Sequence, residues 1–385
     1  MGEVLGEAHG CHHRSPTRRH RPDPEDMDLQ LLEQTLSAHG EPSFRAAQVW
    51  RWAAAGAGGY EAMTNLPLAL REELAKEVPF SSLDVRRELR ARDGTVKALF
   101  ATADGRPLEA VLMRYRSPRG GGAPQGGRGT ADPGATGAGG GGHGRRSICL
   151  SSQSGCPLTC TFCATGAMRF ARNLTTSEIL DQALHFRRIE RVDHCVFMGM
   201  GEPLLNLDAV LAACERLPDL GITHRRTAIS TVGWIPGIER LTECELPLRL
   251  ALSLHAADEA LRSELMPVNE RYPLREVLDA CRAHYARKRR RVFVEYVMLA
   301  GVNDRYEQAV ALAKLLAPTG VEAPLMFKVN LIPFNPTSSP FKGSSREAIA
   351  AFKAALEEHG VQATVRLTRG RDIDAACGQL AAKAA

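Results

Sequence analysis

Three cysteines lie within eight consecutive residues, Cys156, Cys160 and Cys163, with the spacing C-x3-C-x2-C. A structural zinc site takes four ligands, usually from two separated pairs, and an ordinary 4Fe-4S cluster takes four thiolates. Three closely spaced thiolates instead hold three irons of a 4Fe-4S cluster and leave the fourth iron open to a substrate. An odd number of neighbouring thiols also cannot pair off as disulfides. A zinc site or a group of bare thiols is the alternative that this spacing leaves open.

The residues around the cysteines narrow this chemistry. Gly155 precedes the three cysteines, Phe162 stands before the last of them, and the run Met-Gly-Met-Gly-Glu-Pro lies at 198–203. The pattern resembles the radical S-adenosylmethionine (radical SAM) superfamily. The resemblance implies that the open iron chelates the amino and carboxyl groups of SAM, and that one electron splits SAM into methionine and a 5′-deoxyadenosyl radical. A 4Fe-4S cluster and SAM are therefore the expected cofactors.

The composition is that of an ordinary soluble protein. The chain has 385 residues, of which 44% are apolar and 24% charged, and a formal net charge of +5, which permits nucleic-acid binding without requiring it. Its ten cysteines are too unevenly spaced for a secreted disulfide framework. The sequence has no apolar run of about 18 residues and no apolar segment typical of a secretory signal. A cytoplasmic protein with no membrane partner is expected.

Two segments have too little apolar content to fold alone. Residues 1–26 are rich in His, Arg and Pro and are expected to form a disordered basic tail, with Met27 as an alternative start of translation. Residues 117–146 contain thirteen glycines and are expected to form a disordered insertion in a loop. The basic residues of the insertion leave open a contact with RNA phosphates, whereas a solvated linker is the simpler interpretation.

Between these segments the pattern changes from helical to strand-like. Residues 27–80 repeat apolar residues at helical spacing and are expected to form a small helical accessory domain. The apolar stretches 96–102 and 108–115 predict two strands joined by a turn at Asp104-Gly105. Residues 95–116 should therefore form a β-hairpin extension.

From residue 147 onward, strand-like and helix-like runs alternate, which predicts an α/β fold with a parallel sheet and right-handed crossovers. The expected strands are 147–153, 194–198, 227–232, 248–254, 292–299, 328–332 and 361–367. The expected helices lie near 176–190, 207–217, 259–265, 274–287, 304–316 and 345–358. About six repeats favour an open, partial (β/α)6 radical SAM barrel over 147–368, followed by a loop at 369–385. The three cysteines then follow the first barrel strand, on the face where parallel barrels place their chemistry.

Three longer runs make the resemblance more specific. They are Cys149-Leu-Ser-Ser-Gln-Ser-Gly-Cys156, Asn330-Leu-Ile-Pro-Phe-Asn335-Pro and Arg369-Gly-Arg-Asp-Ile-Asp-Ala-Ala-Cys377. Together with the helical N-terminal segment, they resemble the RlmN/Cfr family of radical SAM RNA methyltransferases. The similarity spans about residues 27–380 and departs from the family at the N-terminal tail and at the glycine-rich insertion.

The resemblance implies roles for two further cysteines and a glutamate. The C2 carbon of adenine lies between two ring nitrogens and is not a nucleophile, so it cannot attack the methyl group of SAM. In this family one SAM methylates a carrier thiol, here Cys377, and a radical made from a second SAM activates that methyl group for addition to adenine. A glutamate, here Glu109, takes the C2 proton. A resolving thiol, here Cys149, forms a transient disulfide with Cys377 and releases the methylated base.

Each of these residues also has a plainer interpretation. Cys149 on a strand could be a small core residue, since free cysteine is often buried, and Glu109 could be a surface carboxylate on an edge strand. Cys377 follows two alanines in a loop near the chain end, which is a poor place for a core residue. The four cysteines that fall within strand or helix patterns are expected to be structural: Cys195, Cys214, Cys244 and Cys281.

The resemblance also assigns contacts to SAM, each at or just after the end of an expected strand. Gly201 lets the backbone approach the methionine part of SAM, and Glu202 accepts a hydrogen bond from its ammonium group. The other expected contacts are Ser230, Ser253, Leu254, His255 and Asn335. For His255, a capping role at the end of its strand is the alternative.

The expected macromolecular partner is RNA. The resemblance implies 23S rRNA, at adenosine 2503, and tRNA, at adenosine 37, as substrates. Basic groups at 224–226, 287–291 and 366–371 offer phosphate contacts, although 287–291 also fits a solvated turn. Because C2 is reached only in an unstacked base, the target adenine should lie in a loop or be flipped out. A reducing electron donor of unknown identity is required, and the chain is expected to be a monomer.

Two other functions remain open at this stage. Within the family, the Cfr activity adds a methyl group to C8 of the same rRNA adenine and uses the same arrangement of cysteines. Outside it, a non-enzymatic RNA-binding protein with a structural metal cluster would need no SAM contacts and no thiol pair such as Cys149 and Cys377.

Overall fold

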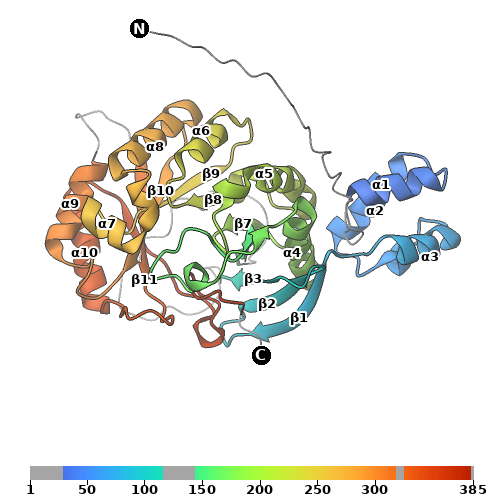
Figure 1. The fold of residues 1–385 in the computed structure, drawn as a ribbon, viewed down its shortest axis with the longest axis horizontal. Helices are drawn as coiled ribbons and strands as arrows, with labels where there is room; N and C mark the ends of the chain where they lie inside the picture. The colour runs from blue at the N-terminus through green and yellow to red at the C-terminus, as the bar shows by residue number, and fades with distance from the viewer. Residues whose placement is uncertain (1–28, 116–143, 318–324, 383–385) are drawn as a thin grey trace, which may run out of the picture.

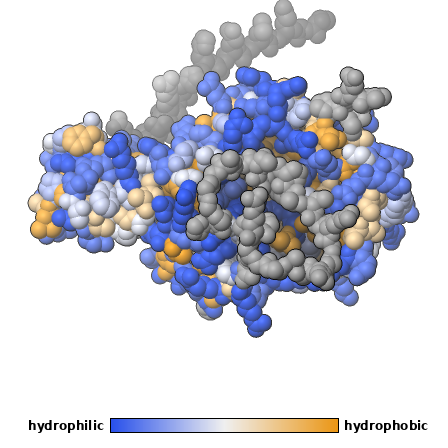
Figure 2. All heavy atoms as spheres, turned by 180° about the vertical axis from the view of Figure 1, so that it is seen from behind, coloured by the Kyte–Doolittle hydropathy of each residue, from blue (hydrophilic) through white to orange (hydrophobic). Residues whose placement is uncertain are grey.

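The computed structural model describes residues 29–115, 144–317 and 325–382, and Figure 1 shows a curved sheet with helices around it and a further group of helices at one side. The tail expected at 1–26 lies outside the described residues, as do 117–143 of the expected insertion. Figure 2 shows hydrophilic side chains over most of the visible surface, with apolar ones in small groups. In the described part of the chain, no helix has the length and apolar composition needed to cross a bilayer.

Three helices open the described chain: α1 (Leu29–Ala38), α2 (Phe44–Ala55) and α3 (Leu68–Glu77). Their apolar faces share a core of their own, in which Leu32 and Leu74 are fully buried. Helix α2 ends at Gly56, whose φ of 103° is the left-handed conformation that glycine adopts readily at helix C-termini. A hydrogen bond of 2.6 Å from Trp50 Nε1 to Asp219 Oδ2 ties this group of helices to the rest of the molecule.

The large sheet begins with three antiparallel strands: β1 (Leu83–Arg90), β2 (Val96–Thr102) and β3 (Pro107–Arg114). Strands β2 and β3 are the two strands expected from the sequence, and Gly105 in the turn between them has a φ of 75°. The sequence pattern does not predict β1, because most of its side chains are exposed and charged. This strand lies at the edge of the sheet and pairs through its backbone with β2, so it needs no apolar alternation.

Parallel pairing starts between β4 and β7 and continues to the far edge of the sheet. Each of the seven expected strands has a counterpart in this part, and β1 and β12 end the described sheet as an open row, as expected for a partial barrel. The strands are β4 (Arg146–Cys149), β7 (His194–Phe197), β8 (Thr227–Thr231), β9 (Arg249–Ser253), β10 (Val292–Met298), β11 (Phe327–Pro333) and β12 (Ala363–Val365).

Helices connect the parallel strands and cover the outer face of the sheet: α4 (Thr176–Ile189), α5 (Leu207–Arg216), α6 (Ile235–Glu243), α7 (Glu259–Leu265), α8 (Leu274–Lys288), α9 (Tyr306–Leu316) and α10 (Arg346–Glu358). The sequence pattern misses α6, because Pro236 and Gly237 near its start are typical of a turn. Proline is tolerated in the first helical turn, where its missing N–H has no helical partner. By contrast, α4 begins with a capping box formed by Thr175 and Glu178.

One large apolar core joins the sheet to these helices, and it fixes the carboxyl ends of the strands relative to one another. Ile148, Ile229, Val294 and Leu331, from β4, β8, β10 and β11, are all fully buried in it. Because a parallel sheet brings all its carboxyl ends to one edge, the loops that follow these strands meet there.

Candidate active site

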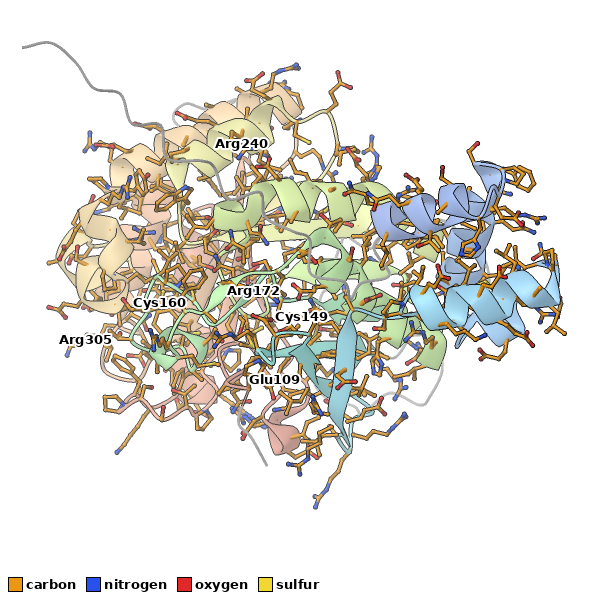
Figure 3. All side chains as sticks on the ribbon, turned by 45° about the vertical axis from the view of Figure 1, so that its right-hand side comes forward. Glu109, Cys149, Cys160, Arg172, Arg240 and Arg305 are labelled. Carbon is orange, nitrogen blue, oxygen red and sulfur yellow. The ribbon has the colours of Figure 1, made fainter. Side chains whose placement is uncertain are left out.

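The loop with the three closely spaced cysteines follows β4 and the short strand β5 (Gln153–Ser154) at the carboxyl edge of the sheet. Its entrance requires glycine: Gly155 has a φ of 76°, and a Cβ there would lie 2.4 Å from the carbonyl oxygen of Arg169. The Cys163 N–H donates a hydrogen bond of 3.2 Å to the Cys160 carbonyl oxygen, which folds the loop into a tight turn. In Figure 3, Cys160 marks this loop.

The three thiols are half-buried and act on one another electrostatically. Burial raises the pKa of Cys156 to about 12. Burial also raises the pKa of Cys160 well above its usual value, and the neighbouring Cys163 and Cys156 add to this effect. Metal binding overcomes such shifts because it selects the thiolate form, and an all-thiol donor set fits a 4Fe-4S cluster. Within 29–115, 144–317 and 325–382, no three His, Cys, Asp or Glu side chains are grouped to hold a single metal ion.

A cavity of about 160 Å³ opens beside this loop, and Cys163 is part of its wall. Five of the seven residues expected to contact SAM line it: Gly201, Glu202, Ser230, Ser253 and His255. They come from the ends of three neighbouring strands, β7, β8 and β9, or from the residues just beyond them. The hydroxyl oxygens of Ser230 and Ser253 lie 3.2 Å apart and form a polar patch in the wall. The cavity therefore offers a polar ligand site next to the cysteine loop.

Gly201 and Glu202 form one corner of this larger cavity. Gly201 has a φ of 96°, and a Cβ there would lie 2.5 Å from the Gln153 Cβ, so no other residue fits without displacement. The two Glu202 oxygens accept hydrogen bonds from the N–H groups of Leu204, at 3.1 Å, and Val232, at 3.0 Å. Burial raises the pKa of Glu202 to about 7. An ammonium group in the cavity would favour the ionised carboxylate, which has lone pairs left to accept from it.

His255 is buried, with a φ of 62°. Its Nδ1 accepts a hydrogen bond of 3.0 Å from the Val297 N–H, so the proton of the neutral ring sits on Nε2. Burial lowers the pKa of His255 to about 3, and the nearby Arg262 lowers it further, so the ring is neutral at physiological pH. His255 thus presents an N–H donor rather than a charge at the end of β9.

The structure places the other two expected SAM contacts elsewhere. Leu254 is fully buried in the core and is not part of the cavity wall, although its N–H donates to the Glu295 carbonyl oxygen at 3.0 Å. Asn335 lines a second, smaller cavity. Its Nδ2 donates to the Cys377 carbonyl oxygen at 3.3 Å, and its buried Oδ1 has no hydrogen-bond partner. Asn335 therefore holds one unused acceptor next to the C-terminal segment.

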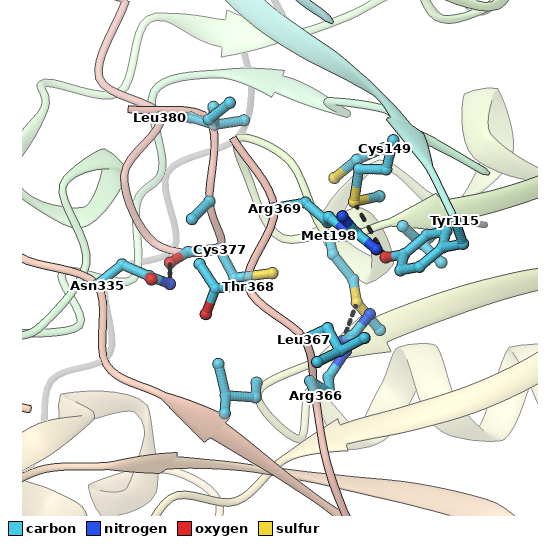
Figure 4. A pocket seen from close by; sticks show the side chains of 15 residues that line it. Tyr115, Cys149, Met198, Asn335, Arg366, Leu367, Thr368, Arg369, Cys377 and Leu380 are labelled. Atoms are coloured by element: carbon cyan, nitrogen blue, oxygen red, sulfur yellow. Dashed lines mark hydrogen bonds between the residues drawn. The ribbon is translucent and has the colours of Figure 1, made fainter. Parts of the chain in front are cut away.

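The smaller cavity, of about 40 Å³, brings together two thiols that are far apart in the sequence. Figure 4 shows Cys149, at the end of β4, and Cys377, in the C-terminal segment, on its walls together with Met198 and Arg366. Cys149 is buried, whereas Cys377 as a whole residue is exposed, although its sulfur is partly shielded from water. Cys377, Met198 and Arg366 line both cavities, so one thiol faces the space beside Cys163 as well as the space beside Cys149.

Hydrogen bonds hold Cys377 in this position. Ala164 directly follows Cys163, the last cysteine of the cysteine loop. Its N–H donates a hydrogen bond of 2.8 Å to the Gly378 carbonyl oxygen. The Thr165 hydroxyl donates to the Leu380 carbonyl oxygen at 2.6 Å. These two hydrogen bonds hold the C-terminal segment, from the residue directly after Cys377 onward, against the cysteine loop.

Glu109, on β3, is a buried carboxylate rather than a surface group, with 4% exposure. Its Oε1 lies 2.9 Å from Lys97 Nζ, and its Oε2 accepts hydrogen bonds from the N–H groups of Ala381, at 3.0 Å, and Ala382, at 3.1 Å. Figure 3 shows Glu109 and Cys149 on adjacent strands. Glu109 is not part of the wall of either cavity, because the C-terminal segment covers it.

The expected basic groups divide between two ends of the sheet. His224–Arg226 precedes β8, and the group at 287–291 precedes β10, so both lie at the amino ends of the strands, where Arg290 Nη2 donates to the Arg225 carbonyl oxygen at 3.2 Å. Residues from 366–369 instead line the smaller cavity. Only this last group lies beside the thiols.

Sequence reasoning missed Lys97, Glu295 and the specific place of Arg366. Lys97 pairs with Glu109, and Arg366 pairs with Glu295, which is 2% exposed. A usable signal was present: Lys97 and Glu295 are single charges inside otherwise apolar strands, and such charges are rarely buried without a partner. The pattern could not reveal which partners they find.

The chain is similar to known proteins over most of its length. Two family models match: the radical SAM superfamily over residues 150–313, and the ribosomal RNA large subunit methyltransferase N-terminal domain over residues 25–79. The probable dual-specificity RNA methyltransferase RlmN of Chloroflexus aurantiacus is 42% identical over 374 residues, which cover 93% of this chain and 92% of that protein. A protein of the same name from Thermus thermophilus is 42% identical over 365 residues, with coverages of 92% and 93%.

A solved structure is also similar over nearly the whole chain. The crystal structure of a radical SAM methyltransferase from Sphaerobacter thermophilus has a TM-score of 0.79 and 40% sequence identity, and the match covers 92% of this chain and 98% of that one. The resemblance thus extends from the cysteine loop to the helical N-terminal region and the order of the strands.

Proposed function

The chain belongs to the RlmN family of radical SAM RNA methyltransferases, and we propose that it methylates C2 of adenine with Cys377 as the methyl carrier. Membership makes the protein an RNA-methylating enzyme that uses a 4Fe-4S cluster and SAM. It therefore excludes the interpretation as a non-enzymatic RNA-binding protein, and the interpretation of the cysteine loop as a zinc site.

One observation carries the proposal: Cys377 lines both cavities. On one side it faces the larger cavity, which Cys163 also lines and where SAM would bind beside the cluster. On the other side it faces Cys149 in the smaller cavity. A carrier thiol has to reach both a methyl donor and a resolving thiol, and no other cysteine of the described chain lines both spaces.

When bound, the cluster supplies the electron that cleaves SAM, and Cys156, Cys160 and Cys163 would hold it. Cys377, as a thiolate, would take a methyl group from one SAM. After a hydrogen atom is removed from this S-methyl group, its carbon would bond to C2 of the adenine. The Cys149 thiolate would then attack the Cys377 sulfur: the S–S bond forms, the bond from the Cys377 sulfur to the methylene carbon breaks, and that carbon keeps the electron pair and takes a proton, which releases the methylated base.

Glu109 would take the C2 proton, which requires a movement of the C-terminal segment. Two backbone N–H groups, of Ala381 and Ala382, occupy Glu109 Oε2, and the segment covers the carboxylate. Release of these two hydrogen bonds would free an acceptor next to β4, on which Cys149 lies.

The proposed substrates are 23S rRNA at adenosine 2503 and tRNA at adenosine 37. The printed name of the relatives, dual-specificity RNA methyltransferase, supports more than one RNA substrate. Arg369, in the wall of the smaller cavity, supports a phosphate contact close to the thiols. The free thiols and an oxygen-sensitive cluster also favour a cytoplasmic enzyme served by a reducing electron donor.

Mass spectrometry of digested RNA tests the proposal. The anaerobic holoenzyme is incubated with SAM, a strong reductant and either a 23S rRNA fragment or tRNA, and 2-methyladenosine is the expected product. Formation of 8-methyladenosine would instead establish the C8 activity, which uses the same cysteines. Absence of any methylated adenosine on both RNAs would refute the proposal.

Two cysteine variants sharpen the test. Cys377→Ala should abolish methylation while the iron content stays unchanged, because it removes only the carrier. Cys244→Ala is the matched control, since Cys244 is a half-buried thiol that lines neither cavity, and it should methylate RNA like the wild type. Methylation by Cys377→Ala would exclude a carrier thiol at this position.

A further inference from the structure

Arg366 occupies a central position between the two thiols of the proposed mechanism. It follows β12 directly and lines both cavities together with Cys377, and it lines the smaller cavity together with Cys149. Its Nη1 contacts the Met198 sulfur at 3.3 Å, and Met198 also lines both cavities. In Figure 4 the Arg366 side chain reaches toward Met198 at the edge of the space that the two thiols face.

We propose that Arg366 is the cation that favours the reactive thiolate forms of Cys149 and Cys377, and that Glu295 limits how much of its charge reaches them. This inference rests on the proposed roles of the two cysteines and adds a residue to which no role has been assigned. Arg366 would not exchange protons itself, because a guanidinium stays protonated at every physiological pH.

The chemistry of both thiols requires the thiolate form, which a nearby cation favours. Methyl transfer forms a bond between the Cys377 sulfur and the methyl carbon and breaks the bond from that carbon to the sulfonium sulfur of SAM, which leaves as S-adenosylhomocysteine with the electron pair. A thiolate does this and a thiol does not. The attack of Cys149 on the Cys377 sulfur has the same requirement.

Burial is the largest influence on the pKa of both thiols, and it opposes their ionisation. Burial raises the pKa of Cys149 to about 12, and the neighbouring Cys377 raises it further, whereas a hydrogen bond from the Met198 backbone and, less strongly, Arg366 lower it. Loss of water around the sulfur raises the pKa of Cys377, and Glu295 and Cys163 add to this, whereas Arg366 again lowers it. Among the charged groups that act on the two thiols, Arg366 is the cation common to both.

Glu295 modulates the effect of Arg366 on the two thiols. Its Oε2 lies 3.0 Å from Arg366 Nη1, and its Oε1 accepts a hydrogen bond of 2.8 Å from Asn330 Nδ2. The carboxylate both fixes the guanidinium and neutralises part of its field. A change at Glu295 should therefore act on the thiols in the opposite direction to a change at Arg366.

Alkylation of the thiols by iodoacetamide tests this inference without RNA or SAM. The anaerobic holoenzyme is treated between pH 6 and 10, and peptide mass spectrometry scores Cys149 and Cys377 separately. A nearby opposite charge lowers a pKa by about 1–3 units, so Arg366→Gln should slow alkylation of Cys377 at pH 8 by about tenfold. Alkylation of Cys149 should slow as well, to a smaller extent, because Arg366 is the weakest of the influences on its pKa. Arg366→Lys keeps the charge and should stay within about threefold of the wild type.

Two further variants separate this role from simple structural damage. Glu295→Gln leaves the guanidinium without its neutralising carboxylate and should speed alkylation, a direction that loss of packing does not predict for both thiols together. Arg369→Gln removes an equal charge from the wall of the same cavity, and Arg369 is not among the groups that shift either thiol. Its alkylation profile should match that of the wild type.

The outcomes are decisive in both directions. Unchanged profiles for Arg366→Gln and Glu295→Gln, or shifts of the same sign for both, would overturn the inference. If Arg366→Gln does not fold, the comparison of Arg366→Lys, Glu295→Gln and Arg369→Gln still decides it. Because no RNA is present, this test is independent of the methylation assay, and a failure of the proposed function would appear only there.

Discussion

The buried ion pair of Lys97 and Glu109 allows a worked prediction about stability. The side chains of the two residues are 10% and 5% exposed, and their charged atoms lie 2.9 Å apart. Lys97→Met removes the cation and leaves a buried carboxylate, a change that typically costs about 3–5 kcal/mol. Because Glu109 keeps its two hydrogen bonds from the C-terminal N–H groups, we expect a loss at the lower end, about 3 kcal/mol.

A double variant and a surface pair provide the controls. Lys97→Met combined with Glu109→Gln removes both charges and keeps an oxygen for the two N–H groups, so it should cost only about 1 kcal/mol. Lys353→Met breaks a 2.7 Å pair with Glu357 on the exposed face of α10, and surface pairs of this kind contribute below about 0.5 kcal/mol.

Urea unfolding of the anaerobic holoenzyme, followed by tryptophan fluorescence, measures these free energies. The reasoning predicts the order Lys97→Met, then the double variant, then Lys353→Met, from the largest loss to the smallest. If Lys97→Met costs no more than Lys353→Met, or if the double variant is as unstable as Lys97→Met, the ion pair does not stabilise a buried carboxylate and the argument fails.

Two further predictions concern SAM binding and base release. Gly201→Ala should destabilise the protein by about 3 kcal/mol and weaken SAM binding in equilibrium dialysis, because its Cβ would collide with Gln153 and its φ is 96°. Gly105→Ala, whose φ is 75° but whose Cβ would meet nothing within 4 Å, should cost only about 1 kcal/mol, and equal losses would exclude the collision. The raised pKa of Cys149, about 12, makes base release faster at high pH, since a larger fraction becomes thiolate as the pH rises. Single-turnover release should speed up about tenfold per pH unit between pH 7 and 9, and a flat profile would contradict this.

The sequence predicted the secondary-structure elements whose local residue pattern agrees with the way they pack in the fold. The buried strands of the barrel are short apolar runs that only a sheet interior accommodates, and the Thr175–Glu178 capping box marks the start of α4. The sequence pattern did not predict strand β1, because tertiary pairing stabilises it, or helix α6, because Pro236 and Gly237 are typical of turns. In both cases the local signal is weak or misleading, and distant partners decide the conformation.

The site was predictable in its residue types more than in its contacts. The motif residues gather around two cavities, yet Leu254 lies in the core and Glu109 lies under the C-terminal segment. Sequence spacing cannot show that Ala381 and Ala382 donate to Glu109, because such a contact joins residues far apart in the chain. It likewise cannot show that Arg366 faces both thiols.

The trapped adduct of Cys149→Ala tests the central claim most directly. Without the resolving thiol, RNA should remain joined to the protein, and combined protease and nuclease digestion should release the Cys377 peptide with one adenosine and one bridging methylene attached. Mass spectrometry locates this link. A link at any residue other than Cys377, or full turnover with no covalent complex, would contradict the proposed roles of the two thiols.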